Sequence, residues 1–247
     1  MCRKTWNEFW GEFFFRRFVE ENPEREGIAR RKAEWIWKYM RLSPGCAVLD
    51  LGCGSGMYDI HLARMGARVI AVDRLQALLA LSRERARHEA VTFLVGDLRT
   101  VSFEPDSFDS VTLFDTVGLM SKADDELLIG RMRQWLRRGG RMAVDSPSPP
   151  KENQSKFSWQ LPDGLLELER TYEPATRILH QDFVFTSNSG EMTRLYDPYD
   201  PARQDHNGVL RYLYSREELA EMMRRCGFSV ELIPHYMNEA DYAFAGA

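Results

Sequence analysis

The stretch VLDLGCGSG, residues 48–56, joins an apolar run, an acidic residue and three alternating glycines. The apolar run predicts a buried strand, and the glycines predict a tight turn before a helix that begins near Met57. Such a turn exposes backbone N–H groups, and the first turn of the helix adds unpaired donors. Asp50 ends the strand, where open α/β sheets bind ligands. The stretch therefore predicts a site for a nucleotide-like ligand.

The composition of the chain is that of a globular protein. It has 247 residues and a formal net charge of -4, which disfavours a general nucleic-acid binder. No apolar run reaches the roughly 18 residues that span a bilayer. Four scattered cysteines lack the paired spacing of a zinc site, so we expect reduced thiols. We expect a cytoplasmic protein that binds neither nucleic acid nor membrane.

Expected strands and helices alternate through the middle of the chain. The expected strands are residues 46–51, 68–73, 91–98, 108–115 and 141–145. The expected helices are residues 57–65, 75–88 and 124–138. This alternation predicts a parallel sheet with right-handed crossovers.

The pattern differs at both ends of this region. Residues 5–41 have apolar side chains at helical spacing and predict two amphipathic helices, the first rich in aromatic residues. After residue 145, three segments alternate as antiparallel strands: 165–172, 178–186 and 191–196. A capping box then predicts a helix from Ser215, followed by strands at 228–233 and 242–245. The expected division is a helical cap (1–44), an α/β core (45–145), an antiparallel β insertion (146–211) and the end of the core (212–247).

Three acidic residues stand at the carboxyl ends of successive expected strands. Asp50, Asp73 and Asp97 are distant in sequence, but a parallel sheet brings these strand ends to one rim. A carboxylate in the position of Asp73 suits a ribose diol, because its oxygens can accept from both hydroxyls. Gly96, Asp97 and Leu98 can place a carboxylate on an exocyclic amine and an apolar side chain on an adenine face.

A nicotinamide-binding protein is the first alternative for such a turn. The glycines run Gly-x-Gly-x-Gly, however, and not the Gly-x-Gly-x-x-Gly of dinucleotide-binding turns. Together, residues 48–56, Asp73, 96–98 and 108–120 resemble the motifs of class I S-adenosylmethionine-dependent methyltransferases. The resemblance implies an α/β fold, a Rossmann-like methyltransferase sheet with an N-terminal helical cap and a small antiparallel β insertion.

Within that superfamily, the chain resembles small-molecule methyltransferases with an insertion after the fifth strand, including N-methyltransferases of amino sugars. The resemblance implies S-adenosyl-L-methionine as cofactor. It departs from the family at residues 115–118, so no acceptor is implied there. The expected cofactor-binding residues are Trp6, Asp50, Gly52, Cys53, Gly54, Gly56, Asp73, Arg74, Gly96, Asp97, Leu98 and Phe114.

Methyl transfer from an activated sulfonium requires chiefly positioning and exclusion of water. A general base matters where the acceptor arrives protonated, and the candidates are Asp115, His180 and His206. A divalent metal between Asp115 and Asp145 has no third ligand, so we expect no metal. The arginines and tyrosines of the insertion either bind an anionic or aromatic acceptor or form a solvent-facing polar surface. They are Arg170, Tyr172, Arg194, Tyr196, Arg211, Tyr212 and Tyr214.

The sequence therefore predicts a methyltransferase acting on a nitrogen or oxygen of a small-molecule acceptor. Two alternatives stay open: a nicotinamide-dependent oxidoreductase, and a methyltransferase-fold protein that binds without turnover. The aromatic N-terminal helix either covers the site or forms the interface of a homodimer.

Overall fold

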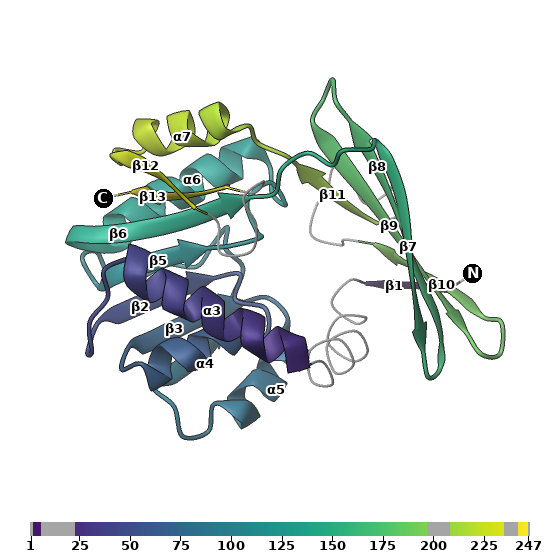
Figure 1. The fold of residues 1–247 in the computed structure, drawn as a ribbon, viewed down its shortest axis with the longest axis horizontal. Helices are drawn as coiled ribbons and strands as arrows, with labels where there is room; N and C mark the ends of the chain where they lie inside the picture. Colours follow the sequence, from purple (N-terminus) through teal and green to yellow (C-terminus); the bar gives the residue numbers. More distant parts are fainter. Residues whose placement is uncertain (1, 6–22, 197–207, 235–241, 247) are drawn as a thin grey trace.

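The chain forms two β-sheets, one of them covered by helices (Figure 1). The computed structural model describes residues 2–5, 23–196, 208–234 and 242–246. The expected first aromatic helix, with Trp6, and the residues around His206 lie outside these ranges. Within these ranges no helix combines the length and the apolar character needed to cross a membrane.

The first sheet has seven strands and confirms the expected Rossmann-like α/β arrangement. In spatial order its strands are β12 (Val230–Pro234), β13 (Tyr242–Gly246), β6 (Leu136–Ser146), β5 (Phe108–Leu113), β2 (Ala47–Leu51), β3 (Arg68–Asp73) and β4 (Val91–Val95). The five strands from β6 to β4 are parallel, and β13 runs antiparallel to both of its neighbours. The chain order reverses on either side of β2, which creates a switch point where such sheets bind ligands.

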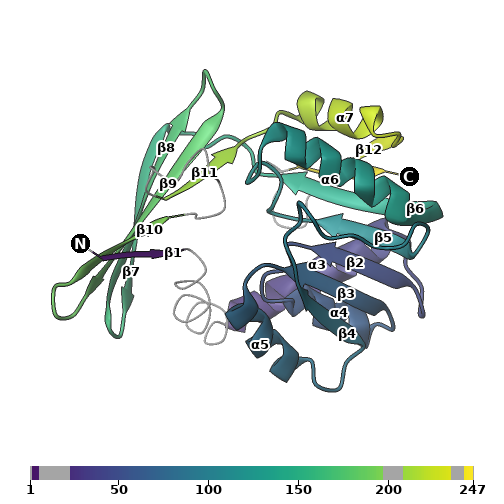
Figure 2. The same cartoon turned by 180° about the vertical axis from the view of Figure 1, so that it is seen from behind.

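Helices cover both faces of this sheet (Figures 1 and 2). One face carries α3 (Pro23–Tyr39), α4 (Met57–Arg64) and α5 (Gln76–Arg85); the other carries α6 (Lys122–Trp135) and α7 (Arg216–Arg225). The expected capping box starts α7, since the Ser215 side chain accepts from the Glu218 N–H and the Glu218 carboxylate accepts from the Ser215 N–H. Ile36 and Leu62 belong to the core on one face, and Leu128 to the core on the other.

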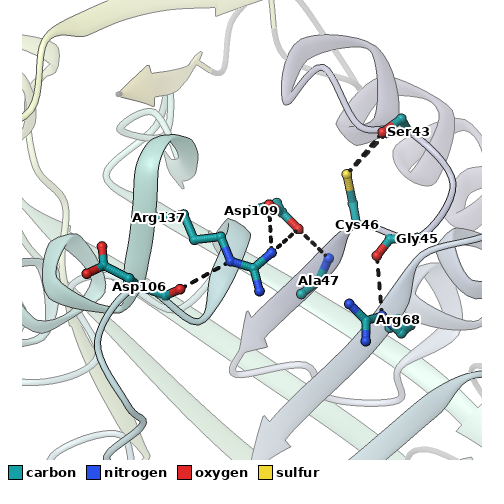
Figure 3. Close-up of polar contacts among 8 residues, drawn as sticks. All are labelled: Ser43, Gly45, Cys46, Ala47, Arg68, Asp106, Asp109 and Arg137. Carbon is teal, nitrogen blue, oxygen red and sulfur yellow. Dashed lines mark hydrogen bonds and ion pairs between the residues drawn. The ribbon is translucent and has the colours of Figure 1, made fainter.

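Polar contacts lie at the amino ends of four neighbouring strands, β2, β3, β5 and β6 (Figure 3). The carboxylate of Asp109 in β5 accepts from Arg137 Nη1 at 2.9 Å and from the Ala47 N–H at 2.7 Å. Arg137 also donates to the Asp106 carbonyl at 3.1 Å, and Arg68 Nε donates to the Gly45 carbonyl at 3.3 Å. These contacts stabilise the amino ends of the strands. The ligand site is expected at the opposite, carboxyl ends.

The second sheet has six strands and confirms the expected antiparallel insertion. Its strands are β1 (Cys2–Thr5), β10 (Met192–Tyr196), β9 (Ile178–Ser187), β8 (Gly164–Glu173) and β7 (Gln154–Leu161), with β11 (Val209–Tyr212) also paired to β9. All pairs are antiparallel except β1 with β10, which is parallel. Figure 2 shows this sheet beside the α/β core, connected to it through β11 and α7.

The structure corrects several expected boundaries. β1 belongs to the second sheet, so the N-terminal segment is not purely a helical cap, and β7 was not expected at all. The expected helix to residue 138 ends at Trp135, because Leu136 already pairs with Phe108. The two glycines at 139–140 lie where the pairing shifts register, before Arg141 meets Ser110.

Candidate active site

The glycine turn packs tightly on two sides and is open on the third. A Cβ added to Gly52 would lie 2.4 Å from Thr116 Oγ1, and one added to Gly56 would lie 2.2 Å from Phe93 Cε1. A Cβ on Gly54 would meet no atom within 4 Å, although its φ of +54° is left-handed like those of its neighbours. Gly54 is therefore the position where a ligand can approach the backbone.

Asp73 joins the end of β3 to this turn. Its Oδ2 accepts from the Gly54 N–H at 2.8 Å, and its Oδ1 accepts from the Leu75 N–H at 2.9 Å. Burial raises the pKa of the Asp73 carboxyl, and the two backbone donors and Arg74 oppose that rise. Each carboxylate oxygen has two lone pairs, so both can accept a further bond from a ligand hydroxyl.

Asp97 lies beyond the end of the neighbouring strand β4. The Gly96 N–H donates to the Asp73 carbonyl at 3.0 Å, which ties the two strand ends together. Arg99 Nη2 lies 2.5 Å from Asp97 Oδ2, and the hydrogen bonds from Arg99 lower the pKa of Asp97. The side chain stays one third exposed (34 %) and accessible to a ligand. Leu98 is half-buried against the α6 side of the core.

Asp50 lies near the carboxyl end of β2, as expected, but its side chain is fully buried beside Lys32 of α3 and Asp59 of α4. Its Oδ1 accepts from Thr112 Oγ1 at 2.6 Å. Burial raises the pKa of Asp50 to about 6, against the opposing charge of Lys32 and the bond from Thr112. Burial and the charge of Asp50 raise the pKa of the neighbouring Asp59 well above its ordinary value.

Lys32 of α3 supplies the positive charge of this region and was not identified from the sequence. Its Nζ lies 4.1 Å from the centroid of the Tyr58 ring and 4.3 Å from that of Phe114. Burial lowers the pKa of Lys32, and the charges of Asp145, Asp50, Asp115 and Asp59 oppose that change. A sequence signal existed, because Lys32 lies on the same helical stripe as the buried Ala29 and Ile36.

Asp115, the expected general base, follows the end of β5 with a left-handed φ of +52°. Its N–H donates to Asp145 Oδ1 at 2.6 Å. Its side chain is largely exposed (79 %), and its Oδ1 accepts from Arg211 Nη1 of β11. Arg211 also donates from Nε to the Val117 carbonyl at 3.2 Å. The loop after β5 is therefore bound to the second sheet.

The strand register divides the polar residues of the second sheet between its two faces. Arg211 is opposite Leu179, which is opposite Tyr172, so Arg211, Tyr172 and Arg170 share one face. We call this the inner face, because Arg211 contacts Asp115 of the core from it. His180 pairs with Leu210 and Thr171 and projects from the outer face, so the structure does not bring this expected base to Asp115.

The remaining arginines and tyrosines have other positions. Arg194 pairs with Val184 on the outer face. Tyr212 contacts Tyr214, with ring centroids 4.7 Å apart, and its hydroxyl donates to Glu218 at 2.8 Å. Trp6 and His206 lie outside the described residues, and so does the side chain of Tyr196.

Asp125 of α6 is hydrogen-bonded to the loop after β5. Its Oδ2 accepts from the Gly118 N–H at 2.9 Å and from the Tyr214 hydroxyl at 3.0 Å. A Cβ on Gly118 would lie 2.0 Å from the Tyr212 carbonyl oxygen, so the loop and β11 are in direct contact. Burial raises the pKa of Asp125 to about 7. From the sequence, Asp125 was expected only to lie within the helix at residues 124–138.

One group in the described part of the chain has metal-ligand spacing: Asp50, Cys53 and Asp59, with ligand-type atoms within 4.8 Å of one another. Burial raises the pKa of the Cys53 thiol well above its ordinary value, which disfavours the thiolate that binds metals. The pair considered from the sequence is engaged elsewhere, because Asp145 accepts from the Asp115 backbone and Asp115 pairs with Arg211.

Comparison with known proteins finds similar sequences over part of the chain. Residues 48–140 match the family model described as a methyltransferase domain. The chain is 36% identical over 109 residues to a demethylmenaquinone methyltransferase of Corynebacterium efficiens, covering 44% of this chain and 45% of that protein. It is 35% identical over 161 residues to a 2-phytyl-1,4-naphtoquinone methyltransferase of Synechococcus elongatus, covering 60% of this chain and 59% of that protein. The chain thus spans about half the length of these curated relatives.

Solved structures share the fold over nearly the whole chain. The CcbJ methyltransferase from Streptomyces caelestis has a TM-score of 0.72 at 16% identity, covering 96% of both chains. An amino pentose methyltransferase from Micromonospora echinaspora has a TM-score of 0.65 at 19% identity, covering 90% of both chains. The resemblance to class I S-adenosylmethionine-dependent methyltransferases is confirmed, and none of these relatives supports the nicotinamide alternative.

Proposed function

We propose that this protein uses S-adenosyl-L-methionine to methylate a nitrogen or oxygen atom of a small molecule. The observation that carries the proposal is the open turn at Gly54, bonded to Asp73 and flanked by Asp97 at the next strand end. These three residues lie within the region that matches the methyltransferase domain model. The names of the relatives cover a quinone and an amino pentose, both small molecules.

The residues present fit the cofactor. Asp73 would accept hydrogen bonds from the ribose hydroxyls, and Asp97 from the adenine amine. Leu98 would contact the adenine face, and the open backbone at Gly54 admits the ligand where a side chain would block it. When bound, the cofactor supplies an activated methyl group on a sulfonium. The other expected contacts, from Gly52, Gly56, Arg74, Gly96 and Phe114, belong to this proposal.

The protein's task is then to hold the acceptor and exclude water, an effect that can supply about 7–11 kcal/mol. The inner face of the second sheet and the loop after β5 would form the acceptor side of the site. Asp115 would accept the proton of an ammonium or alcohol at Oδ2, because its Oδ1 is bound by Arg211.

Calorimetry with S-adenosylhomocysteine tests the cofactor assignment. We expect binding to the wild type, and a loss of about tenfold or more in Asp73→Ala and in Asp97→Ala, since each loses hydrogen bonds to a charged acceptor. Glu217→Ala, an exposed change on α7, is the control and should bind like the wild type. No binding to the wild type, or undiminished binding to both aspartate variants, would contradict the proposal.

Mass spectrometry of reactions with amine and hydroxyl acceptors tests the transfer itself. A product methylated at nitrogen or oxygen supports the proposal. Cofactor binding without any methylated product across a broad panel would instead favour the alternative of binding without turnover. The cytoplasmic setting, the absence of nucleic-acid and membrane partners, and a homodimer stay predictions.

A further inference from the structure

We infer that the acceptor carries a carboxylate, which Arg211 and Arg170 bind on the inner face of the second sheet. This inference rests on the proposed function, because it assigns the substrate class of the same site.

Arg211 is the more deeply buried of the two arginines. Its side chain is only 7% exposed, yet it carries a full positive charge. Nη1 binds Asp115 and Nε binds the Val117 carbonyl, while Nη2 is buried and has no hydrogen-bond partner in the described part of the chain. Because an unsatisfied buried donor is costly, an additional acceptor oxygen at Nη2 would be stabilising.

Arg170 extends the same positive region along β8. Burial lowers the pKa of Arg170, the charge of Asp115 opposes this, and the like charge of Arg211 adds to it. Arg170 therefore lies within electrostatic range of both members of the Arg211–Asp115 pair. Its Nε is also buried without a partner in the residues described, and its guanidinium carbon lies 5.1 Å from the centroid of the Phe157 ring.

Among the described residues, the charges on this part of the inner face do not balance. Two guanidinium groups face one described carboxylate, that of Asp115, so one positive charge is in excess within this part of the chain. The nearby acids of β8 do not compensate, since Glu167, Glu169 and Glu173 alternate with the inward residues and are exposed. A ligand carboxylate would neutralise the excess, and its two oxygens could accept from the arginine donors that have no partner among the described residues.

The surroundings also favour an apolar body on such an acceptor. Leu166, Leu168 and Phe183 form a buried cluster on the same face, with Trp159 and Phe185 packed against it. Phe157, between the cluster and Arg170, keeps 42% of its surface exposed. An aromatic carboxylate can therefore contact both the guanidinium groups and an aromatic surface.

Calorimetry with benzoate, and with neutral benzamide for comparison, tests the inference in the presence of saturating S-adenosylhomocysteine. We expect the wild type to bind benzoate about tenfold or more tightly than benzamide, as charge-assisted hydrogen bonds predict. Arg211→Gln and Arg170→Gln should each remove most of this preference. Lys156→Gln removes the same charge from the outer face and should retain it.

Equal binding of benzoate and benzamide to the wild type, or no binding of either, would overturn the inference. So would an unchanged benzoate preference in the folded arginine variants. If Arg211→Gln fails to fold, as circular dichroism would reveal, Arg170→Gln decides alone, because Arg170 is less buried. Binding of S-adenosylhomocysteine is measured first in each protein, so failure of the cofactor assignment is distinguished from failure of the carboxylate site.

Discussion

Replacing Asp125 by asparagine should change how the stability of the protein depends on pH. Asp125 is fully buried in α6, and its Oδ2 accepts from the Gly118 N–H and the Tyr214 hydroxyl. Burial raises its pKa from 3.8 to about 7, although these hydrogen bonds and the charge of Arg211 favour the ionised form. The folded protein therefore holds this proton at pH values where the unfolded chain releases it.

The sign and size of the effect follow from this difference. An acid whose pKa is raised on folding contributes stability that is fully present below 3.8 and is lost as the pH rises through about 7. Each unit of pKa difference corresponds to about 1.4 kcal/mol, so the stability lost between about pH 5 and pH 8 is about 3 kcal/mol. Asparagine does not ionise, so the Asp125→Asn variant should lack this loss.

Urea unfolding of the wild type and Asp125→Asn at these two pH values provides the measurement. The unfolding free energy of the wild type relative to the variant should fall by about 3 kcal/mol from the lower to the higher pH. The control is Asp106→Asn, the same change at an exposed position away from Asp125, and its pH dependence should follow the wild type. A difference between wild type and Asp125→Asn that is the same at both pH values would refute the reasoning.

Two further predictions concern the glycine turn and the amino ends of the strands on the opposite side of the sheet. Gly56→Ala should destabilise the protein more than Gly54→Ala. At both positions alanine would need a left-handed φ, which costs about 1–2 kcal/mol. Only at Gly56 would the added Cβ also collide with Phe93. Urea unfolding compares them, and equal losses would contradict the collision. Arg137→Ala should lower the unfolding free energy by up to about 1 kcal/mol through its partly exposed pair with Asp109. It should leave S-adenosylhomocysteine affinity unchanged, and weaker binding by the folded variant in calorimetry would count against the placement of the site.

Local sequence patterns were sufficient for the α/β core. The expected strand at residues 68–73 has the observed bounds of β3, and the capping box at Ser215 starts α7 as expected. Both depend on neighbouring residues alone: an apolar run bounded by turns, and a side chain that accepts from the backbone three residues later. The alternation of such elements was enough to predict the parallel sheet.

The acceptor side of the site could not be predicted from local sequence patterns, because it is formed by contacts between residues distant in sequence. His180 and Arg211 lie on opposite faces because of the pairing of β9 with β11, and a shift of one residue would exchange the faces. β7 is largely exposed and polar, so its strand signal was weak. The burial of Lys32 and Asp125 arises from elements that are distant in sequence, and a charged residue on a helix is ordinarily expected at the surface.

The parallel pairing of β1 with β10 has a consequence for the order in which the chain folds. Cys2 pairs with Thr193, so β1 finds its partner only after the residues up to β10 have been made. Contacts between such distant segments form slowly, because a long loop must close before they are gained. The strands from β2 to β6 pair with segments closer in sequence, so their contacts close shorter loops. We therefore expect the core to form first on the ribosome, and the sheet that carries Arg170 and Arg211 to be completed later, when β1 pairs with β10.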